Sequence, residues 1–262
     1  MTALAGRIAA VITALIVAVG PIPGPGPGPT RPPTPTPSHP AVVLASLGDS
    51  LTYQPDGSAT ASYRGELSRV LTLAGQPHTW ALGGIPGVKC SYWAANVEAF
   101  IVANQPDVIL LDCGTNDTPT DDTQADYDTI LDVAAAHGVT VVAALIGIPD
   151  MRTPTNSVRP EIDDWMHLTN DRIEASLASH PGVRFIDTQR IPANLEWLQS
   201  DGVHWTARTM AAVGQLFYEP LAQILGLPTL DGLNVTLMCG LSGSWYTDPE
   251  PVPYVDYIPC TR

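Results

Sequence analysis

The sequence predicts a three-layer α/β/α domain with a central parallel sheet of about five strands. From residue 41 onward, short runs rich in Val, Ile and Leu recur, and they are almost continuously apolar, as in strands covered on both faces. Longer amphipathic stretches separate these runs, as expected for helices that cross over between parallel strands. Hydrophobic residues make up 45% of the chain and charged residues only 15%, so most of the chain can fold around a core.

Each predicted strand is a short apolar run in the second, folded part of the chain. AVVLASL opens the series, HTWALG is the second run, and VILLDC, the third, ends at Gly114. VTVVAALIGI is the fourth run, and VRFID is a short fifth one. The five strands are predicted at residues 41–47, 78–83, 108–113, 139–148 and 183–187.

The stretches that follow the strands are predicted to be helices. In the first of them, Leu67, Val70, Leu71 and Ala74 recur at spacings of three and four residues and so share one face. In sheets of this kind, ligands bind beyond the carboxyl ends of the strands, so we expect the chemistry in the loops there. The five helices are predicted at residues 62–74, 92–104, 124–137, 164–179 and 206–225.

The first 20 residues predict export from the cell. Arg7 is followed by an apolar stretch over residues 8–19, a length typical of a signal peptide. The alternative interpretation is an uncleaved N-terminal anchor. In that case this segment is the only membrane tether that we expect. We therefore expect the protein to be secreted or associated with the cell envelope.

Three further segments follow along the chain. Residues 21–40 contain ten of the 26 prolines and predict an extended Pro/Gly-rich linker. One folded domain is predicted over residues 41–230. Residues 231–262 lack helical periodicity and carry aromatic side chains among prolines, so an irregular extension packed on the domain is predicted. A carbohydrate-binding platform is the alternative for that extension.

The charge of the chain limits its partners. Lys and Arg number 12 and Asp and Glu 26, which gives a net charge of −14. A surface this acidic repels the phosphate backbone of nucleic acids. Nucleic acid is therefore excluded as a partner. The four cysteines form no CxxC motif and no cluster with histidine, so no metal site is expected. No organic cofactor is expected either. We expect a monomer.

Four short polar motifs lie where strands end or where the last helix begins. Each motif alone is compatible with an ordinary turn or helix cap. Together they supply a serine nucleophile, a histidine three residues after a carboxylate, and side-chain and backbone hydrogen-bond donors, which is what acyl transfer requires. The motifs are GDSL at 48–51, GIPG at 84–87, GTND at 114–117 and DGVH at 201–204.

With these motifs in this order, the chain over residues 43–225 resembles the SGNH/GDSL family of serine hydrolases. The resemblance implies the flavodoxin-like fold of that family and a catalytic triad of Ser50, Asp201 and His204. No G-x-S-x-G motif occurs, and the three-residue spacing from Asp201 to His204 differs from that of ordinary α/β-hydrolases.

The same resemblance implies an oxyanion hole. Its donors are expected to be the N–H groups of Ser50 and Gly87 and the side-chain amide of Asn116. The glycine motif departs from the family pattern, because ALGGIPG lacks the leading Asn, and alignment assigns the donor to Gly87 rather than Gly84.

The implied oxyanion hole leads to a prediction for the cysteines. Gly87 and Asn116 have to converge on one oxyanion, so Cys90 and Cys113 should lie in or beside the same two loops. We therefore expect disulfides Cys90–Cys113 and Cys239–Cys260, the second fixing the C-terminal extension. A packed free thiol is the alternative for Cys113.

The resulting functional prediction is a secreted or cell-surface serine esterase. It hydrolyses an acyl ester of a carbohydrate or lipid through an acyl-enzyme on Ser50. An O-acyltransferase of the same fold and a non-catalytic surface binding module are the alternatives. The polar segment 149–163, which follows the fourth strand, is the expected substrate-contact loop.

Overall fold

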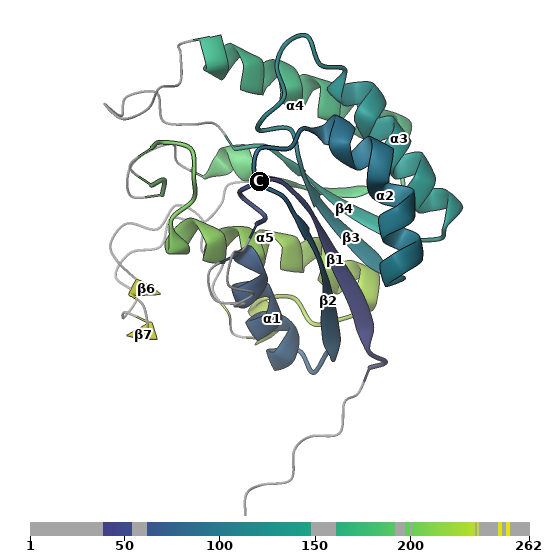
Figure 1. The fold of residues 1–262 in the computed structure, drawn as a ribbon. Coiled ribbons are helices and arrows are strands. Elements are labelled where there is room, and N and C mark those ends of the chain that lie inside the picture. Colours follow the sequence, from purple (N-terminus) through teal and green to yellow (C-terminus); the bar gives the residue numbers. More distant parts are fainter. Residues whose placement is uncertain are drawn as a thin grey trace, which may run out of the picture. The chain divides into compact units, whose positions relative to one another are not determined.

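A computed structural model describes residues 39–53, 62–147, 161–191, 197–199, 201–233, 235, 246–247 and 250–251. Its main feature is one sheet of five parallel strands in the order β2-β1-β3-β4-β5 (Figure 1). The predicted parallel sheet is thus confirmed. The strands are β1 (Val42–Gly48), β2 (His78–Gly84), β3 (Val108–Asp112), β4 (Thr140–Leu145) and β5 (Arg184–Asp187).

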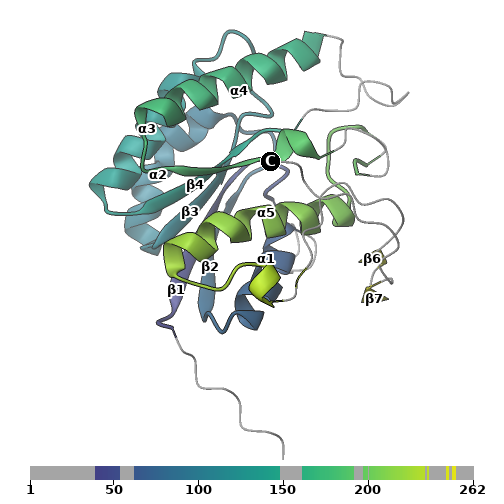
Figure 2. The same ribbon diagram turned by 180° about the vertical axis from the view of Figure 1, so that it is seen from behind.

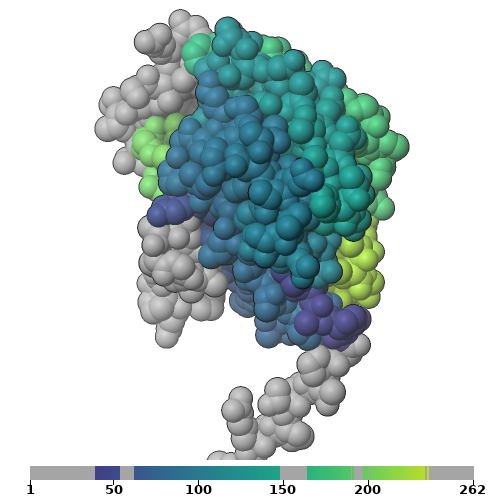
Figure 3. Space-filling view, turned by 45° about the vertical axis from the view of Figure 1, so that its right-hand side comes forward, coloured from purple at the N-terminus to yellow at the C-terminus, as the bar shows by residue number. Residues whose placement is uncertain are grey.

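Helices cover both faces of the sheet, which confirms the three-layer α/β/α prediction. Helices α1 and α5 pack on one face, and α2, α3 and α4 lie on the other (Figures 1 and 2). In the space-filling view, the blue and teal surface turned toward the reader includes α2 and α3 (Figure 3). The helices are α1 (Tyr63–Leu73), α2 (Cys90–Asn104), α3 (Thr123–Ala136), α4 (Glu161–Ser179) and α5 (Ala207–Leu225).

Shorter elements complete the described chain. Two single-turn 3₁₀ helices, η2 (Thr188–Arg190) and η3 (Asp231–Leu233), follow β5 and α5. The strands β6 (Tyr246–Thr247) and β7 (Glu250–Pro251) form an antiparallel pair.

The two faces of the sheet explain the continuous apolar strands. Along β3, Val108 and Leu110 belong to the core beneath α1 and α5, while Ile109 and Leu111 belong to the core beneath α2, α3 and α4. All five residues of β3 are buried. Because successive side chains of a strand point to opposite faces, a strand covered on both sides is apolar along most of its length, and β3 departs from this only at its last residue, Asp112.

The register of the sheet brings three strand ends together. Gly48 at the end of β1 pairs with Gly84 at the end of β2 and with Asp112 at the end of β3. The loops that leave these three residues therefore start side by side. They carry the GDSL, GIPG and GTND motifs.

Several predicted boundaries differ from the observed ones. The fourth strand ends at Leu145 rather than at residue 148, because the side chain of Asn170 takes both backbone groups of Ile146 (2.8 and 3.0 Å). Helix α2 begins at Cys90, two residues before its predicted start, and α4 begins at Glu161, three residues before its predicted start.

Some predictions concern parts of the chain outside the described residues. They are the signal segment 1–20, nearly all of the linker 21–40, most of the loop 149–163 and the disulfide Cys239–Cys260. Among the residues that the structure does describe, no helix combines the length and the apolarity needed to span a membrane.

Candidate active site

Ser50 lies in a tight turn directly after β1. The N–H of Tyr53 donates to the carbonyl of Asp49 (2.9 Å), and the N–H of Leu51 donates to Oδ1 of the same residue (2.9 Å). Gly48 is required before this turn, since a Cβ there would overlap the carbonyl oxygen of Asp112 and the side chain of Thr52. The turn is thereby packed against β3.

His204 is held by a short antiparallel contact just before α5. Leu198 and Trp205 form an isolated bridge, and the N–H of Gln199 donates to the carbonyl of His204 (2.7 Å). Trp197 and Trp205 are both buried and anchor the two arms of this contact in the core. The backbone on both sides of His204 is therefore fixed while its ring stays partly exposed.

Asp201 is oriented toward the ring of His204. Its Oδ1 accepts the N–H groups of Val203 and His204 (both 2.9 Å), and its Oδ2 lies 2.6 Å from Nδ1 of His204. Partial burial acts to raise the pKa of Asp201, but these hydrogen bonds outweigh burial and hold the pKa below the ordinary value. Asp201 is thus an anion that fixes the imidazole through Nδ1.

The other ring nitrogen of His204 faces Ser50. The distance from Nε2 to the Ser50 Oγ is 3.0 Å, across 154 residues of sequence. With the proton on Nδ1, Nε2 is free to accept the Ser50 hydroxyl proton. The structure brings Ser50, His204 and Asp201 into one hydrogen-bonded row, the arrangement used to activate a serine.

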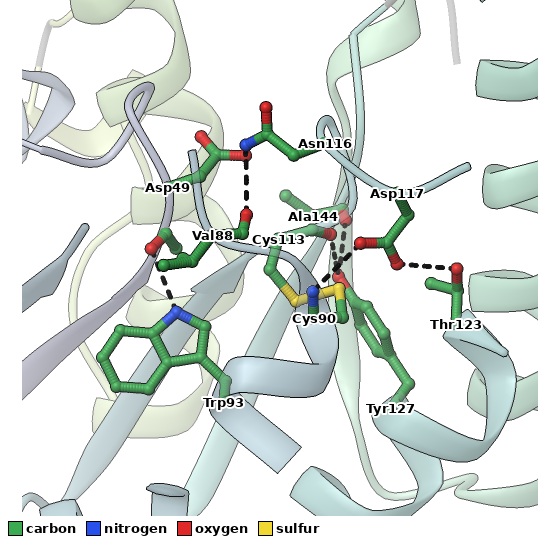
Figure 4. The surroundings of a disulfide bond; sticks show 11 residues. Asp49, Val88, Cys90, Trp93, Cys113, Asn116, Asp117, Thr123, Tyr127 and Ala144 are labelled. Atoms are coloured by element: carbon green, nitrogen blue, oxygen red, sulfur yellow. Dashed lines mark hydrogen bonds between the residues drawn. A yellow bond between two sulfur atoms is a disulfide. The ribbon is translucent and has the colours of Figure 1, made fainter. Parts of the chain in front are cut away.

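Asn116 lies between the turn that carries Ser50, called here the Ser50 turn, and the loop after β2. Its Nδ2 donates to Oδ2 of Asp49 and to the carbonyl of Val88, both at 3.1 Å (Figure 4). Gly87 immediately precedes Val88 and has a φ of 77°, a conformation that favours glycine. The structure therefore places Gly87 and Asn116 in adjoining loops.

Asp49 links the turn that carries Ser50 to Asn116, a contact that the motifs alone do not predict. The carboxylate is buried and binds the Leu51 N–H on one oxygen and the Asn116 amide on the other. Burial raises its pKa, against the lowering effect of the Leu51 N–H and of His204. The sequence signal that could have pointed to this contact is the position of Asp49 inside the GDSL motif.

A second buried carboxyl, Asp112, lies behind the Ser50 turn. Thr52 Oγ1 donates weakly to Oδ2 of Asp112 (3.4 Å), and Oδ1 has no hydrogen-bond partner among the described residues. Burial, and then repulsion from Asp49, raise the pKa of Asp112 well above the ordinary value. This carboxyl therefore favours its neutral form.

The predicted disulfide Cys90–Cys113 is present and joins the first residue of α2 to the residue after β3. Both cysteines are fully buried, so the free-thiol alternative for Cys113 is wrong. Within the part of the chain that the structure describes, no group of three or more His, Cys, Asp or Glu side chains could hold a metal ion.

Residues 46–212 match the GDSL-like Lipase/Acylhydrolase family, and all five predicted catalytic and oxyanion residues fall in this range. The chain belongs to this family. The family predicted from the sequence and the predicted class of enzyme, an ester hydrolase, are thereby confirmed. No curated protein sequence matches the chain.

Solved structures of esterases share the fold of this family member. The Clostridium thermocellum family 3 carbohydrate esterase is 20% identical with a TM-score of 0.55, over 71% of this chain and 98% of that one. The acetyl xylan esterase AlAXEase is 19% identical with a TM-score of 0.57, over 69% and 100%. A lipase/acylhydrolase from Enterococcus faecalis is 20% identical with a TM-score of 0.57, over 71% and 97%.

Proposed function

We propose that the protein is a serine esterase that acts outside the cytoplasm on acyl esters of carbohydrates or lipids, through an acyl-enzyme on Ser50. The observation that carries the proposal is the row from the Ser50 Oγ through the His204 imidazole to the Asp201 carboxylate, with distances of 3.0 and 2.6 Å. Family membership supports an ester as the substrate.

Acylation begins when Oγ of Ser50 attacks the carbonyl carbon of the ester. The hydroxyl proton moves to Nε2 of His204, and the Asp201 carboxylate stabilises the resulting imidazolium through Nδ1. When the tetrahedral intermediate collapses, the C–O bond to the alcohol breaks and His204 returns the proton to the leaving oxygen. The acyl group then remains on Ser50.

Deacylation repeats these proton transfers with water. His204 removes a proton from the attacking water molecule and returns it to Ser50 as the acid leaves. The half-exposed state of the His204 ring gives solvent a route to the acyl-enzyme. A sugar hydroxyl that reached this point in place of water would make the enzyme an O-acyltransferase.

The negative charge that develops on the carbonyl oxygen requires donors. We assign them to the N–H groups of Ser50 and Gly87 and to the amide of Asn116. The amide nitrogen of Asn116 carries two hydrogens, and Asp49 and Val88 accept both of them. Asn116 therefore donates to the oxyanion after its bond to Asp49 is released. Loss of one such donor typically lowers turnover by ~10²–10³-fold.

Esters of carbohydrates are the first substrates to test. Two of the esterases that share the fold are described as a carbohydrate esterase and an acetyl xylan esterase. The apolar segment at residues 8–19, with its adjoining Pro/Gly-rich linker, supports a site of action outside the cytoplasm, where such polymers occur.

The decisive experiment is a panel of acyl esters that varies both acyl length and alcohol, assayed with wild type and with Ser50→Ala. We expect turnover of at least one ester by wild type and a loss of ~10³-fold or more in the variant. A fluorophosphonate probe should label wild type and leave Ser50→Ala unlabelled.

The outcomes separate the three functional predictions. Equal labelling of wild type and variant, or labelling of neither, favours a non-catalytic binding module. Transfer of the acyl group to added polyols, in place of release of free acid alone, favours an O-acyltransferase.

A further inference from the structure

The loops that follow β2 and β3 are fastened to each other at the start of α2. Lys89, which precedes α2, makes no side-chain hydrogen bond that would cap the helix. The N–H of Cys90 instead donates to Oδ1 of Asp117, in the loop after β3, at 3.0 Å. A carboxylate at a helix N-terminus satisfies an N–H that has no partner within the helix and interacts favourably with the helix dipole. Asp117 thus caps α2 from a different loop.

The second oxygen of Asp117 is held as well. The hydroxyl of Thr123, the first residue of α3, donates to Oδ2 at 2.7 Å (Figure 4). Asp117 is 3% exposed and Thr123 is fully buried. Burial raises the pKa of Asp117, while the bonds from Thr123 and Cys90 act to lower it. The carboxylate is therefore fixed between the first residues of two helices.

A covalent link lies at the same point. The Cys90–Cys113 disulfide ties the side chain of Cys90 to the loop that already binds its backbone. We call Asp117, Cys90 and Cys113 the loop brace. Gly87 lies three residues before Cys90, and Asn116 directly precedes Asp117, so the loop brace adjoins both residues to which we assign oxyanion donation.

We propose that Asp117 is a positioning residue for the esterase reaction, which acts with the Cys90–Cys113 disulfide to hold the Gly87 and Asn116 donors at a fixed separation. The proposal rests on the proposed function of this site. The loops that carry the oxyanion donors need a fixed separation before charge develops, and a misplacement of about 1 Å can lower turnover by about 10²-fold. Substrate binding depends much less on that separation, because the oxyanion forms only in the transition state.

The test is the full chain with Asp117→Ala, assayed on the ester that wild type turns over fastest. We expect kcat to fall by ~10- to 100-fold while KM changes by less than about threefold. Asp117→Asn should retain most of the activity, because its side-chain oxygen can still accept the Cys90 N–H. If Asp117→Ala does not fold, Thr123→Val, which removes one of the two bonds to the carboxylate, serves as the milder variant.

The matched control is Asp107→Ala. Asp107 Oδ2 likewise accepts one backbone N–H, that of Val43 (2.7 Å), but it does so at the amino end of β1, away from the site. This variant should change stability without changing kcat. A Cys90→Ala/Cys113→Ala double variant tests the covalent link, and its combination with Asp117→Ala should lower kcat by more than the product of the two separate effects, because both ties between the loops are then lost.

Amide hydrogen exchange provides a readout that does not depend on turnover. Exchange in residues 85–93 and 113–117 should speed up by about tenfold or more in Asp117→Ala and stay unchanged in Asp107→Ala. Unchanged exchange in Asp117→Ala overturns the proposal, as does faster exchange with an unaltered kcat, or an equal loss of kcat in Asp107→Ala. If wild type hydrolyses no ester in a Ser50-dependent way, the proposed function fails, and hydrogen exchange alone decides whether the loop brace exists.

Discussion

The imidazole of His204 lies between two oxygen atoms with different proposed roles: one orients the ring, and the other gives its proton to the ring. Asp201 Oδ2 holds Nδ1 at 2.6 Å, and Ser50 Oγ lies 3.0 Å from Nε2. An amide in place of the carboxylate can keep the backbone contacts of Asp201, but it no longer stabilises the imidazolium and it permits the wrong tautomer.

Asp201→Asn should therefore lower kcat by about 10³–10⁴-fold with little change in KM, as measured by steady-state ester hydrolysis. The matched control is Asp132→Asn, because Asp132 pairs with His180 at the surface at 3.3 Å, away from the site. A loss of less than tenfold in Asp201→Asn would show that the carboxylate does not serve His204 in catalysis.

Asp112 leads to a prediction about pH and stability. Its pKa is raised by burial and then by Asp49, so the folded state holds this proton while the unfolded chain releases it from the ordinary value of 3.8 upward. Stability is therefore lost as the pH rises from there to the raised pKa. Asp112→Asn does not titrate, so it should become more stable than wild type by up to about 1.4 kcal/mol per pH unit in that window.

Chemical denaturation at pH 5, 7 and 9 checks this expectation. The difference in unfolding free energy between Asp112→Asn and wild type should grow from the lowest pH upward. A difference that is the same at all three pH values would mean that Asp112 ionises in the folded protein as it does in the unfolded chain.

Whole helices and strands could be predicted from the sequence, but their ends could not always be. Apolar runs and helical spacing predicted the parallel sheet and its helices, because the residues on the buried face of a strand or helix have to be apolar. The start of α2 depends on Asp117, 27 residues beyond Cys90, and the end of β4 depends on Asn170, 24 residues beyond Ile146. No local pattern contains that information.

The candidate site likewise has a part that could be predicted from the sequence and a part that could not. The motifs placed Ser50, His204 and Asn116 at strand ends or before the last helix, and the register of the sheet explains why they meet. The links between motifs were not predictable, since the contacts of Asp49 with Asn116 and of Asp117 with Cys90 join loops that are distant in sequence.

The end of β1 yields a prediction for the Ser50 turn. A Cβ on Gly48 would overlap the Asp112 carbonyl and the Thr52 side chain, so Gly48→Ala has to displace β3 or the Ser50 turn. We expect a loss of roughly 1–3 kcal/mol in unfolding free energy, together with reduced ester turnover. The control is Gly182→Ala, where an added Cβ meets no atom within 4 Å. Wild-type stability in Gly48→Ala would contradict this packing argument.

At the scale of the molecule, the chain divides into two units, residues 1–36 and 37–262, and every residue that the structure describes lies in the second. The family match and all five predicted catalytic and oxyanion residues lie in the second unit. A chain that begins at residue 37 should therefore keep its kcat/KM within about twofold and its Tm within about 2 °C. Thermal unfolding and ester hydrolysis measure both. A large loss in either would show that the first unit takes part in folding or catalysis.

The separation of 154 positions between Ser50 and His204 also bears on how the enzyme is made. β1 leaves the ribosome early and α5 late, so for most of its synthesis the chain carries a serine but no base. In the proposed mechanism, an unfinished chain, or one that stops before DGVH, lacks the base that activates Ser50. On that mechanism, Ser50 is activated only when nearly the whole domain has emerged, so incomplete copies are expected to have no esterase activity.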